Sequence, residues 1–325
     1  MHCTLLVADL LPPAPDLPPP RAPALATLLA RADAAAAGTG HEAWLCEACG
    51  VARERDWPVA PLTLAAVGGD PAGGWWLRCD PVHLVLRHNG LHASDIAVAT
   101  DDEARAIACA LDTHFTANGL AFRAGVDGRC YVRDDAHSDV ATVPLAAALG
   151  RDVDGCLPMG AHAAHWRRVL NEIQMLLHGH PVNAAREARG LPPLNSVWLW
   201  GGGRLPRAAT APWQRLWADD PLARGLGQFA GIGAAPLPAS ADAVFDAGED
   251  ALVALAAASA DAAGWTQSIE QLERAWFAPA LAALRGRRLA RLSIVATGAR
   301  NLRFDLAPRA LWRWWRRPRP LDSHG

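Results

Sequence analysis

The sequence contains no lysine, and all 31 of its basic residues are arginine. A catalytic Schiff base and a Walker-type phosphate loop both need a lysine amine, so this chain can use neither chemistry. A large excess of one charge is also missing, because 33 acidic residues nearly balance the arginines. We therefore expect neither nucleic acid nor an anionic membrane as a partner.

Long apolar runs and paired cysteines are absent as well. No stretch is long and apolar enough to span a bilayer, and no basic segment precedes an apolar run near residue 1. The seven cysteines, from Cys3 to Cys156, form no paired framework. Cys46 and Cys49 lack the second ligand pair that a structural zinc site needs. The sequence therefore predicts reduced thiols and a cytoplasmic location.

Short apolar runs alternate with helix-like or loop-rich sequence, which predicts the α/β class, a parallel sheet flanked by helices. The runs expected to form buried strands are 4–8, 197–200, 251–255 and 292–296. The gap between the first two is far too long for one crossover, so we expect a domain to be inserted there. The alanine-rich segments 23–37 and 256–263 are expected to be helical.

The inserted region has the pattern of a smaller α+β domain. Asn89-Gly90, between two apolar runs, predicts a hairpin turn. The expected strands are 75–79, 83–86, 91–93, 121–123 and 129–133, and the expected helix is 104–118. The predicted organisation is a core of 1–56 and 191–310, an inserted domain of 57–160, a helical connection of 161–190 and a tail of 311–325.

The tail mixes tryptophan with arginine from Leu311 onward. That mixture can stack on nucleic-acid bases or lie at a membrane surface. The balanced charge of the chain favours a different role, in which the tryptophans cap the core and the arginines face solvent.

The segment 170–206 holds the most specific pattern in the chain. Its first helix presents one apolar face, His180-Pro181 starts a second helix, and Gly190 ends it. Gly201 to Gly203 follow a short apolar strand and leave the backbone free to turn or to approach a ligand. The apolar face consists of Trp166, Val169, Leu170, Ile173 and Leu177.

This segment resembles the signature of archaeal-type, cofactor-independent phosphoglycerate mutases, which belong to the alkaline phosphatase superfamily. The matching residues are His180 to Asn183, Arg186, Gly190, Pro193, Asn195, Val197 to Gly201 and Gly203. Similar short segments elsewhere extend the likeness over most of the chain: 60–62, 76–80, 95–96, 102–104 and 225–231. LNEIQMLLH, HPVN and NSVWLWGGG are still closer to a degenerate branch, the regulator-of-pathogenicity-factors E type, to which we expect this chain to belong.

The resemblance implies a hydroxyl nucleophile and two divalent metals, manganese or magnesium, held by aspartate and histidine. Asp9 matches the first aspartate, whereas the segment of the nucleophilic serine falls on 40–51, where 41–45 has no hydroxyl. The D-E-x-G-H motif falls on 259–265, with Asp261 kept and Trp265 in place of the histidine. The T-G-D-H motif falls on 297–300, where Ala299 and Arg300 replace both ligands.

These departures predict a protein that keeps the fold but has lost the binuclear centre, with Asp9 and Asp261 as its vestiges and no cofactor. We expect a catalytically inactive, phosphoglycerate mutase-like protein with a regulatory or metabolite-binding role. A phosphorylated or carboxylate metabolite would be held by a pocket of Asn171, His180, Asn183, Arg186, Asn195 and Trp200. A structural role stays equally open: helix caps, a turn, and pairing of Arg186 with a carboxylate such as Glu172.

Two other functions are compatible with the residues. An active mutase or phosphatase relative, dependent on manganese or magnesium, would need relocated ligands, for which His162, His165, His178 and His180 with Glu172 are the candidates. A protein-interaction scaffold would use exposed tryptophans, for which the candidates are Trp75, Trp76 and 312–315.

Overall fold

A computed structural model describes residues 1–12, 17, 19–38, 40–88, 90–94, 98–126, 128–149, 151–257, 262–318 and 321. The chain divides into two compact units. Unit 1 consists of Met1–Val51 and Ala208–Gly325, and unit 2 of Ala52–Arg207. The second unit is thus inserted into the first, with bounds that differ from the predicted 57–160.

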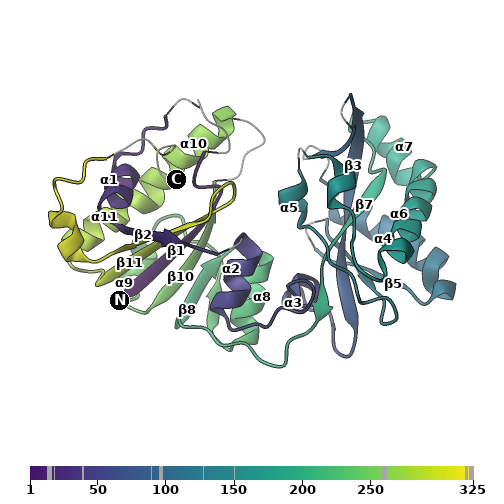
Figure 1. Cartoon of the computed structure of the whole chain (residues 1–325), viewed down its shortest axis with the longest axis horizontal. Helices are drawn as coiled ribbons and strands as arrows, with labels where there is room; N and C mark the ends of the chain where they lie inside the picture. Colours follow the sequence, from purple (N-terminus) through teal and green to yellow (C-terminus); the bar gives the residue numbers. More distant parts are fainter. Residues whose placement is uncertain are drawn as a thin grey trace. The chain divides into compact units, whose positions relative to one another are not determined.

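Unit 1 is built on a seven-stranded sheet in the order β2-β12-β11-β1-β10-β8-β9 (Figure 1). The strands β11, β1, β10, β8 and β9 pair in parallel, and β12 and β2 add an antiparallel edge. The predicted parallel sheet is therefore confirmed. Its strands are β1 (His2–Ala8), β2 (Asp33–Ala36), β8 (Arg215–Ala218), β9 (Gly233–Ala235), β10 (Ala251–Ala256), β11 (Arg291–Thr297) and β12 (Leu302–Leu306).

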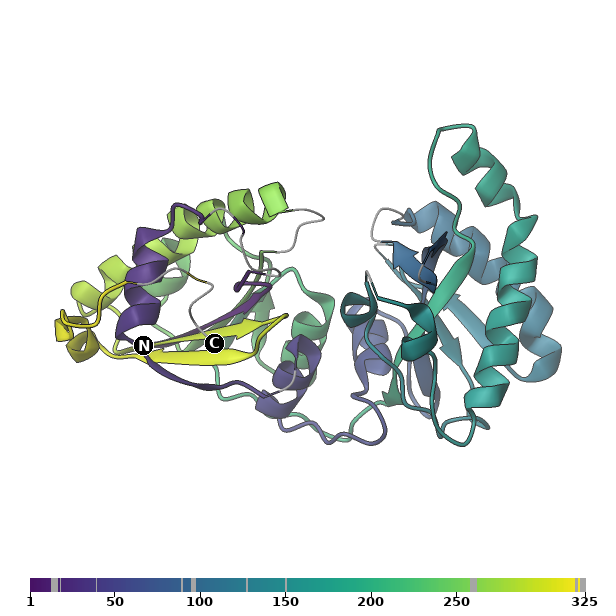
Figure 2. The same ribbon diagram turned by 45° about the horizontal axis from the view of Figure 1, so that its top comes forward.

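Helices cover both faces of this sheet. Cys3, Leu5 and Val7 alternate along β1 and join residues of α1, α10 and α11 in one apolar core. Figure 2 shows these three helices on one side of the sheet. Thr4 points to the other face, where its hydroxyl accepts a hydrogen bond from the indole N–H of Trp213. The Trp213 ring contacts Trp44 of α2, so α2 lies on that face. The helices are α1 (Pro23–Arg31), α2 (His41–Ala48), α8 (Pro221–Phe229), α9 (Asp242–Asp246), α10 (Ala262–Leu272), η3 (Glu273–Phe277), α11 (Ala278–Arg285) and η4 (Pro308–Trp312).

The prediction of a helix over 23–37 is wrong in its second half. Helix α1 ends at Arg31, Ala32 is extended with ψ of 161°, and β2 pairs antiparallel with β12. Pairing with a neighbouring strand satisfies the backbone there and overrides the helix propensity of alanine. The second alanine-rich segment falls largely on 258–261, outside the described residues.

Unit 2 holds an antiparallel sheet in the order β4-β3-β6-β5, with β7 also paired to β3. Its strands are β3 (Trp75–Arg87), β4 (Gly90–Ser94), β5 (Ala121–Ala124), β6 (Cys130–Arg133) and β7 (Ser196–Arg204). The run 197–200 was expected in the parallel sheet, and this expectation is wrong, because β7 pairs antiparallel with β3. Helices α3 and α6 cover its two faces, and burial on both faces produces the continuous apolar run that is typical of parallel strands.

Strand β3 is longer than predicted and runs through Asp80-Pro81 without a break. On one edge, β6 pairs with it only from Trp76 to Arg78 and β4 only from His83, so Pro81 falls between the two partners. A proline is tolerated where no ladder bond is required of it. The predicted hairpin is present, with Arg87 opposite Gly90, although Asn89 lies outside the described residues.

The helices of unit 2 include both helices of the signature segment. All five residues of the predicted apolar face of α6 are buried, and they pack into the unit's main core with α4 and β7. The helices are α3 (Val59–Ala66), α4 (Asp101–Phe115), η1 (Thr116–Asn118), α5 (Leu145–Ala148), η2 (Val153–Cys156), α6 (Ala163–His178) and α7 (Pro181–Glu187). Within the part of the chain that is described, no helix has the length and apolarity needed to cross a membrane.

The tail contradicts the expected packing. Trp312, Trp314 and Trp315 are 78%, 76% and 64% exposed, so they do not cap the core. Arg313 instead forms an ion pair with Asp33 at 2.5 Å and also donates to the backbone of the chain beside β2. Arginine is long enough to reach this carboxylate, and the tryptophans are left facing solvent.

Candidate functional site

The carboxyl end of β1 carries Asp9, the residue matched to a metal ligand. Asp9 has φ of 55°, in the left-handed region, and its N–H donates to the carbonyl oxygen of Thr297 at 2.7 Å. Gly298 makes room for this arrangement, because a Cβ there would collide with the Asp9 carboxylate. Burial raises the pKa of Asp9, and the neighbouring His41 partly opposes that rise.

His41 lies beside this edge at the start of α2. Its Nε2 is 3.7 Å from Asp220 Oδ2, and its Nδ1 is 3.5 Å from the hydroxyl of Thr297. Burial acts to lower the pKa of His41, but the hydrogen bond and charge of Asp220 outweigh it, so the pKa is raised. Thr297 is only 1% exposed, and its hydroxyl is therefore closed to an incoming substrate.

The positions matched to lost metal ligands hold residues that do not bind metals. Trp265 is 2% exposed, and its Nε1–H donates to the backbone carbonyl of Asp9 at 2.8 Å. Ala299 and Arg300 follow β11 in the turn before β12. Asp261 lies outside the described residues. Among those that are described, no three potential ligands converge at this edge of the sheet.

Two of the three asparagines of the predicted ligand pocket, Asn183 and Asn195, form hydrogen bonds within unit 2. Asn183 donates to the carbonyl oxygens of Leu177 and Leu194 at 2.7 and 3.0 Å, and accepts from the Leu194 N–H. Asn195 accepts from the N–H of Leu84 and donates to its carbonyl oxygen, at 2.7 and 2.8 Å. Both amides thus join segments of the fold.

Arg186 is also used inside the unit. It is 2% exposed, donates to Glu103 at 2.6 Å, and donates through Nε to the carbonyl oxygen of Pro192 at 2.7 Å. Burial acts to raise the pKa of Glu103, but the Thr100 N–H and the guanidinium groups of Arg186 and Arg189 lower it below its usual value. Arg186 therefore pairs with a carboxylate, as the structural reading expects, but that carboxylate is Glu103.

The remaining pocket candidates do not converge on one cavity. His180 accepts from the N–H of Val182 and caps α7, as expected from its place before Pro181. Trp200 donates to Asp80 at 2.8 Å, and Asn171 is exposed on α6.

Gly201 to Gly203 make room for protein neighbours. A Cβ on each would lie 2.8 Å from Val59 Cβ, 2.6 Å from Trp75 Cζ2 and 2.7 Å from Pro58 Cβ, respectively. These contacts let β3 and the start of α3 pack directly against the backbone of β7. Gly202 and Gly203 therefore serve close packing where a turn or a ligand was expected, whereas Gly201, with φ of 67°, also needs the backbone freedom of glycine.

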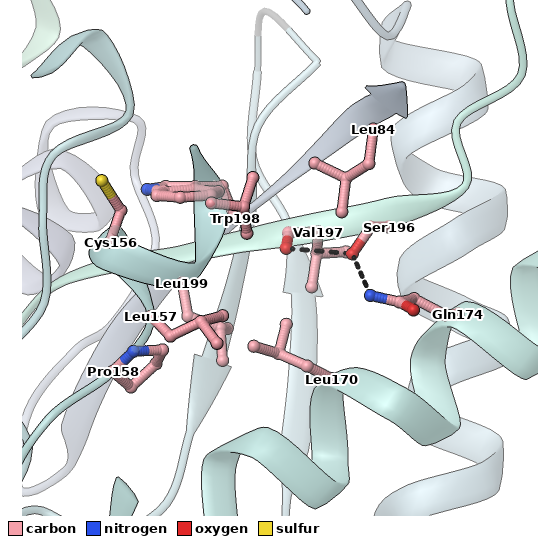
Figure 3. A pocket seen from close by; sticks show the side chains of 11 residues that line it. Leu84, Cys156, Leu157, Pro158, Leu170, Gln174, Ser196, Val197, Trp198 and Leu199 are labelled. Atoms are coloured by element: carbon pink, nitrogen blue, oxygen red, sulfur yellow. Dashed lines mark hydrogen bonds between the residues drawn. The ribbon is translucent and has the colours of Figure 1, made fainter. Parts of the chain in front are cut away.

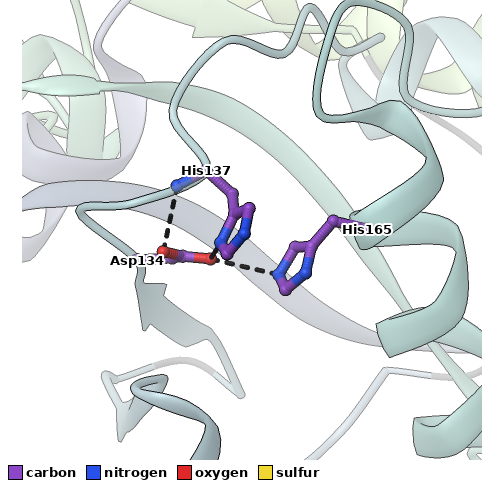
Figure 4. Close-up of side chains that lie close together, drawn as sticks. All are labelled: Asp134, His137 and His165. Atoms are coloured by element: carbon purple, nitrogen blue, oxygen red, sulfur yellow. Dashed lines mark hydrogen bonds and ion pairs between the residues drawn. The ribbon is translucent and has the colours of Figure 1, made fainter.

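Three potential metal ligands do converge in unit 2, where Asp134 and His137 follow β6 and His165 lies in the first turn of α6 (Figure 4). His137 Nδ1 and His165 Nε2 lie 2.8 and 3.1 Å from Asp134 Oδ2. Asp134 and His137 are not among the candidate ligands predicted from the sequence. The signal was present in RDDAH, a polar run directly after a strand.

The histidine cluster expected from sequence does not form. His165 belongs to the group just described, while His162 accepts from the N–H of Asp139 and His180 caps α7. Glu172 lies 3.6 Å from His114, a residue outside the expected cluster.

Two cavities lie in unit 2. The first has a volume of about 30 Å³, enough for one water molecule, and its lining includes Leu84, Gln174, Ser196 and Trp198 (Figure 3). The side-chain amide of Gln174 donates a hydrogen bond to the Ser196 hydroxyl in the wall of this cavity. The second has about 380 Å³ and is lined by Asp70, Trp76, Arg123 and Arg133 among others. Of these two cavities, which described residues line, the second has the size and the cationic groups for a small anionic metabolite.

The seven cysteines are all free, and six of them are buried. Burial raises the pKa of Cys49 to about 11 and that of Cys46 further, so both are protonated thiols at neutral pH. A buried, protonated thiol is a poor nucleophile, because the thiolate is the reactive form.

Comparison with known proteins relates the chain to one family of enzymes. No family model matches the sequence. A 2,3-bisphosphoglycerate-independent phosphoglycerate mutase from Methanosarcina barkeri is 26% identical over 183 residues, which cover 53% of this chain and 45% of that protein. The 2,3-bisphosphoglycerate-independent phosphoglycerate mutase 2 of Methanothermobacter thermautotrophicus is 31% identical over 189 residues, 53% of this chain and 44% of the relative. The chain thus matches less than half the length of these curated relatives.

Among solved structures, the PH0037 protein from Pyrococcus horikoshii aligns with a TM-score of 0.54 at 13% identity, over 94% of this chain and 87% of that one. This likeness shows a shared mixed α/β fold, with a parallel-rich sheet flanked by helices and a second, antiparallel sheet. The chain is therefore phosphoglycerate mutase-like, with cofactor-independent enzymes as its homologues at low identity.

Proposed function

We propose that this protein is a catalytically inactive relative of the cofactor-independent phosphoglycerate mutases, with a regulatory role based on binding a metabolite. The observation that carries the proposal is Trp265, which is buried against the backbone of Asp9 where the resemblance places a metal-binding histidine. The motif likeness is also the basis for assigning the chain to the regulator-of-pathogenicity-factors E type.

The chemistry of phosphoryl transfer explains why these replacements matter. Two divalent metals must neutralise charge on the transferring group, and a hydroxyl must attack it. An indole offers no lone pair to a metal, and the positive charge of Arg300 repels one. The described residues around Asp9 therefore do not fit a binuclear manganese or magnesium centre.

A coupled assay on the purified full chain, with 3-phosphoglycerate and manganese, tests the loss of activity. We expect no turnover above the buffer rate, with an archaeal-type mutase assayed in parallel as the positive control. Turnover that disappears in an Asp9→Asn variant would belong to this chain and would overturn the proposal. Turnover that persists unchanged in that variant would instead identify a contaminating host enzyme and leave the expected result in place.

The cavity of about 380 Å³ in unit 2 is the best-supported place for a phosphorylated or carboxylate metabolite. The guanidinium of Arg133 is partly neutralised by Asp135, to which its Nε–H donates at 2.8 Å, so Arg123 is the principal cation facing a ligand there. Asn183, Asn195 and Arg186 of the signature cannot serve this purpose without breaking hydrogen bonds of the fold.

Calorimetric titration with 3-phosphoglycerate and 2-phosphoglycerate tests this site. Arg123→Gln is expected to weaken binding at least about tenfold, the equivalent of one charge-assisted hydrogen bond. The matched control is Arg151→Gln, which removes an exposed arginine elsewhere in unit 2. Absence of heat with the wild-type chain, or equal losses in both variants, would contradict binding in this cavity.

A scaffold function is a second candidate, supported by the exposed Trp312, Trp314 and Trp315. Tryptophan is enriched at binding hot spots, and Arg313 and Arg316 anchor this segment to Asp33. We expect replacement of the three tryptophans by alanine to abolish recovery of a specific partner in crosslinking from cell extract. A monodisperse monomer with no partner in light scattering would rule against this function.

A further inference from the structure

We propose that Asp134, His137 and His165 form a binding site for a divalent transition-metal ion, in particular zinc. The site lies in unit 2, whereas the metal centre implied by the family resemblance would lie at Asp9 in unit 1. It would therefore be a different site with a different ligand set. A carboxylate with two imidazoles is a donor set that suits zinc.

The distances between the ligand atoms are close to those in a zinc site. All three atoms lie within 4.8 Å of one another, and Asp134 Oδ2 is 2.8 Å from His137 Nδ1 and 3.1 Å from His165 Nε2. Zinc binds such atoms at about 2.0 to 2.2 Å in a tetrahedron, which separates neighbouring ligands by roughly 3.3 Å. An increase of about half an ångström or less in each of these two separations would bring them to the spacing of neighbouring zinc ligands.

His165 supplies an independent indication of a ligand. Its Nε2 is buried and forms no hydrogen bond of good geometry; it lies 3.1 Å from Asp134 Oδ2, with which it forms an ion pair. A buried nitrogen that forms no hydrogen bond costs free energy, and a metal ion in the cluster would use its lone pair.

The surrounding hydrogen bonds hold two of the ligands in place. Asp134 Oδ1 accepts from the N–H groups of Ala136 and His137, which leaves Oδ2 for the cluster. The Trp166 indole donates to the carbonyl oxygen of His137 at 2.9 Å and ties the loop to α6. Such outer-shell bonds orient metal ligands.

The exposure of the three side chains leaves one side open. Asp134 is 4% exposed and His165 19%, whereas His137 is 35% exposed and has room to turn. The imidazoles are stacked with centroids 3.6 Å apart and planes at 7°. A metal lies in the plane of each ring that binds it, so binding must open this stack, and the open side admits water as a fourth ligand.

The test is a titration of the chelator-treated full chain with zinc chloride, followed by calorimetry and by elemental analysis after dialysis. We expect one zinc per chain and a rise in Tm. Asp134→Asn and His165→Gln should each weaken binding at least about a hundredfold, because loss of an outer-shell partner alone costs about 10- to 100-fold. The Asp134→Asn variant keeps the Oδ1 atom that accepts the two backbone hydrogen bonds, and His165→Gln removes no hydrogen bond through Nε2. Without zinc, both variants should therefore retain the wild-type circular dichroism spectrum.

Three control variants keep the result specific. His178→Gln removes a histidine from the same helix, Cys49→Ser tests the buried thiols, and Asp9→Asn tests the sheet edge of unit 1. Unchanged zinc binding in all three supports the proposal. Equal binding by wild type and His165→Gln, or loss of binding in any control, would overturn it. None of these readouts depends on mutase activity, so the proposed function can fail without affecting this test.

Discussion

Arg186 illustrates how a residue type that suggests ligand binding can belong to the framework. Its guanidinium has the planar geometry that grips phosphate or carboxylate, and the structure directs it to Glu103 and to the backbone of Pro192. The side-chain amides of Asn183 and Asn195 likewise form hydrogen bonds with backbone groups of neighbouring segments. At this scale, the signature preserves hydrogen bonds that hold α7, β3 and β7 of unit 2 together.

Glu103 permits a matched comparison of two arginines. The side chain of Arg186 is 3% exposed and that of Arg189 is 51% exposed, and both form ion pairs with this carboxylate. We expect Arg186→Met to lower the free energy of unfolding by about 3 to 5 kcal/mol, because it leaves a buried carboxylate without its main partner. Arg189→Met should cost less than about 1 kcal/mol, since solvent screens its charge. Urea denaturation of both variants provides the measurement, and equal losses would show that the burial of Arg186 does not matter.

At the scale of elements, the strand β7 depends on three glycines that admit its neighbours. Gly203 faces Pro58, whose Cβ and backbone Cα would lie 2.7 and 2.9 Å from a new Cβ. A proline ring and a backbone atom cannot turn aside as a flexible side chain can. The glycine run is therefore a packing requirement between β7 and the start of α3.

Gly203→Ala tests this requirement. We expect the substitution to destabilise the protein by about 1 to 3 kcal/mol, the usual cost of overpacking, and Tm to fall accordingly. The control is Gly179→Ala after α6, where a Cβ would meet nothing within 4 Å and φ is −101°. A neutral Gly203→Ala, or a control that is equally destabilised, would show that the close approach is not what these glycines provide.

Elements with a strong local pattern were predictable from sequence, and those determined by distant partners were not. Local pattern alone predicts the apolar strands β1, β10 and β11 and the apolar stripe of helix α6. Burial of a strand, or of one face of a helix, leaves a regular pattern of apolar residues along the chain. Strand β2 is four exposed residues whose state depends on pairing with β12. The same holds for the site: Asp134 and His165 are 31 positions apart and meet only because β6 and α6 pack in one unit.

At the scale of the whole molecule, each unit has a main hydrophobic core of its own, and among the described residues these two cores share none. Phe304, Ile294 and the strands of the parallel sheet belong to the core of unit 1, whereas Ile173 and Trp166 belong to that of unit 2. Units with separate cores can unfold as separate cooperative regions. We therefore expect a substitution in one core to leave the hydrogen bonds of the other unit intact.

A pair of core truncations tests this independence. Ile173 and Ile294 are both 0% exposed, and replacing either by alanine should cost about 2 to 5 kcal/mol. In hydrogen exchange followed by mass spectrometry, Ile173→Ala should speed exchange in peptides from 52–207 only, because it weakens the core of unit 2 alone. Ile294→Ala should speed exchange only in peptides from 1–51 and 208–325. Faster exchange throughout the chain in both variants would mean that the two units unfold together as one cooperative structure.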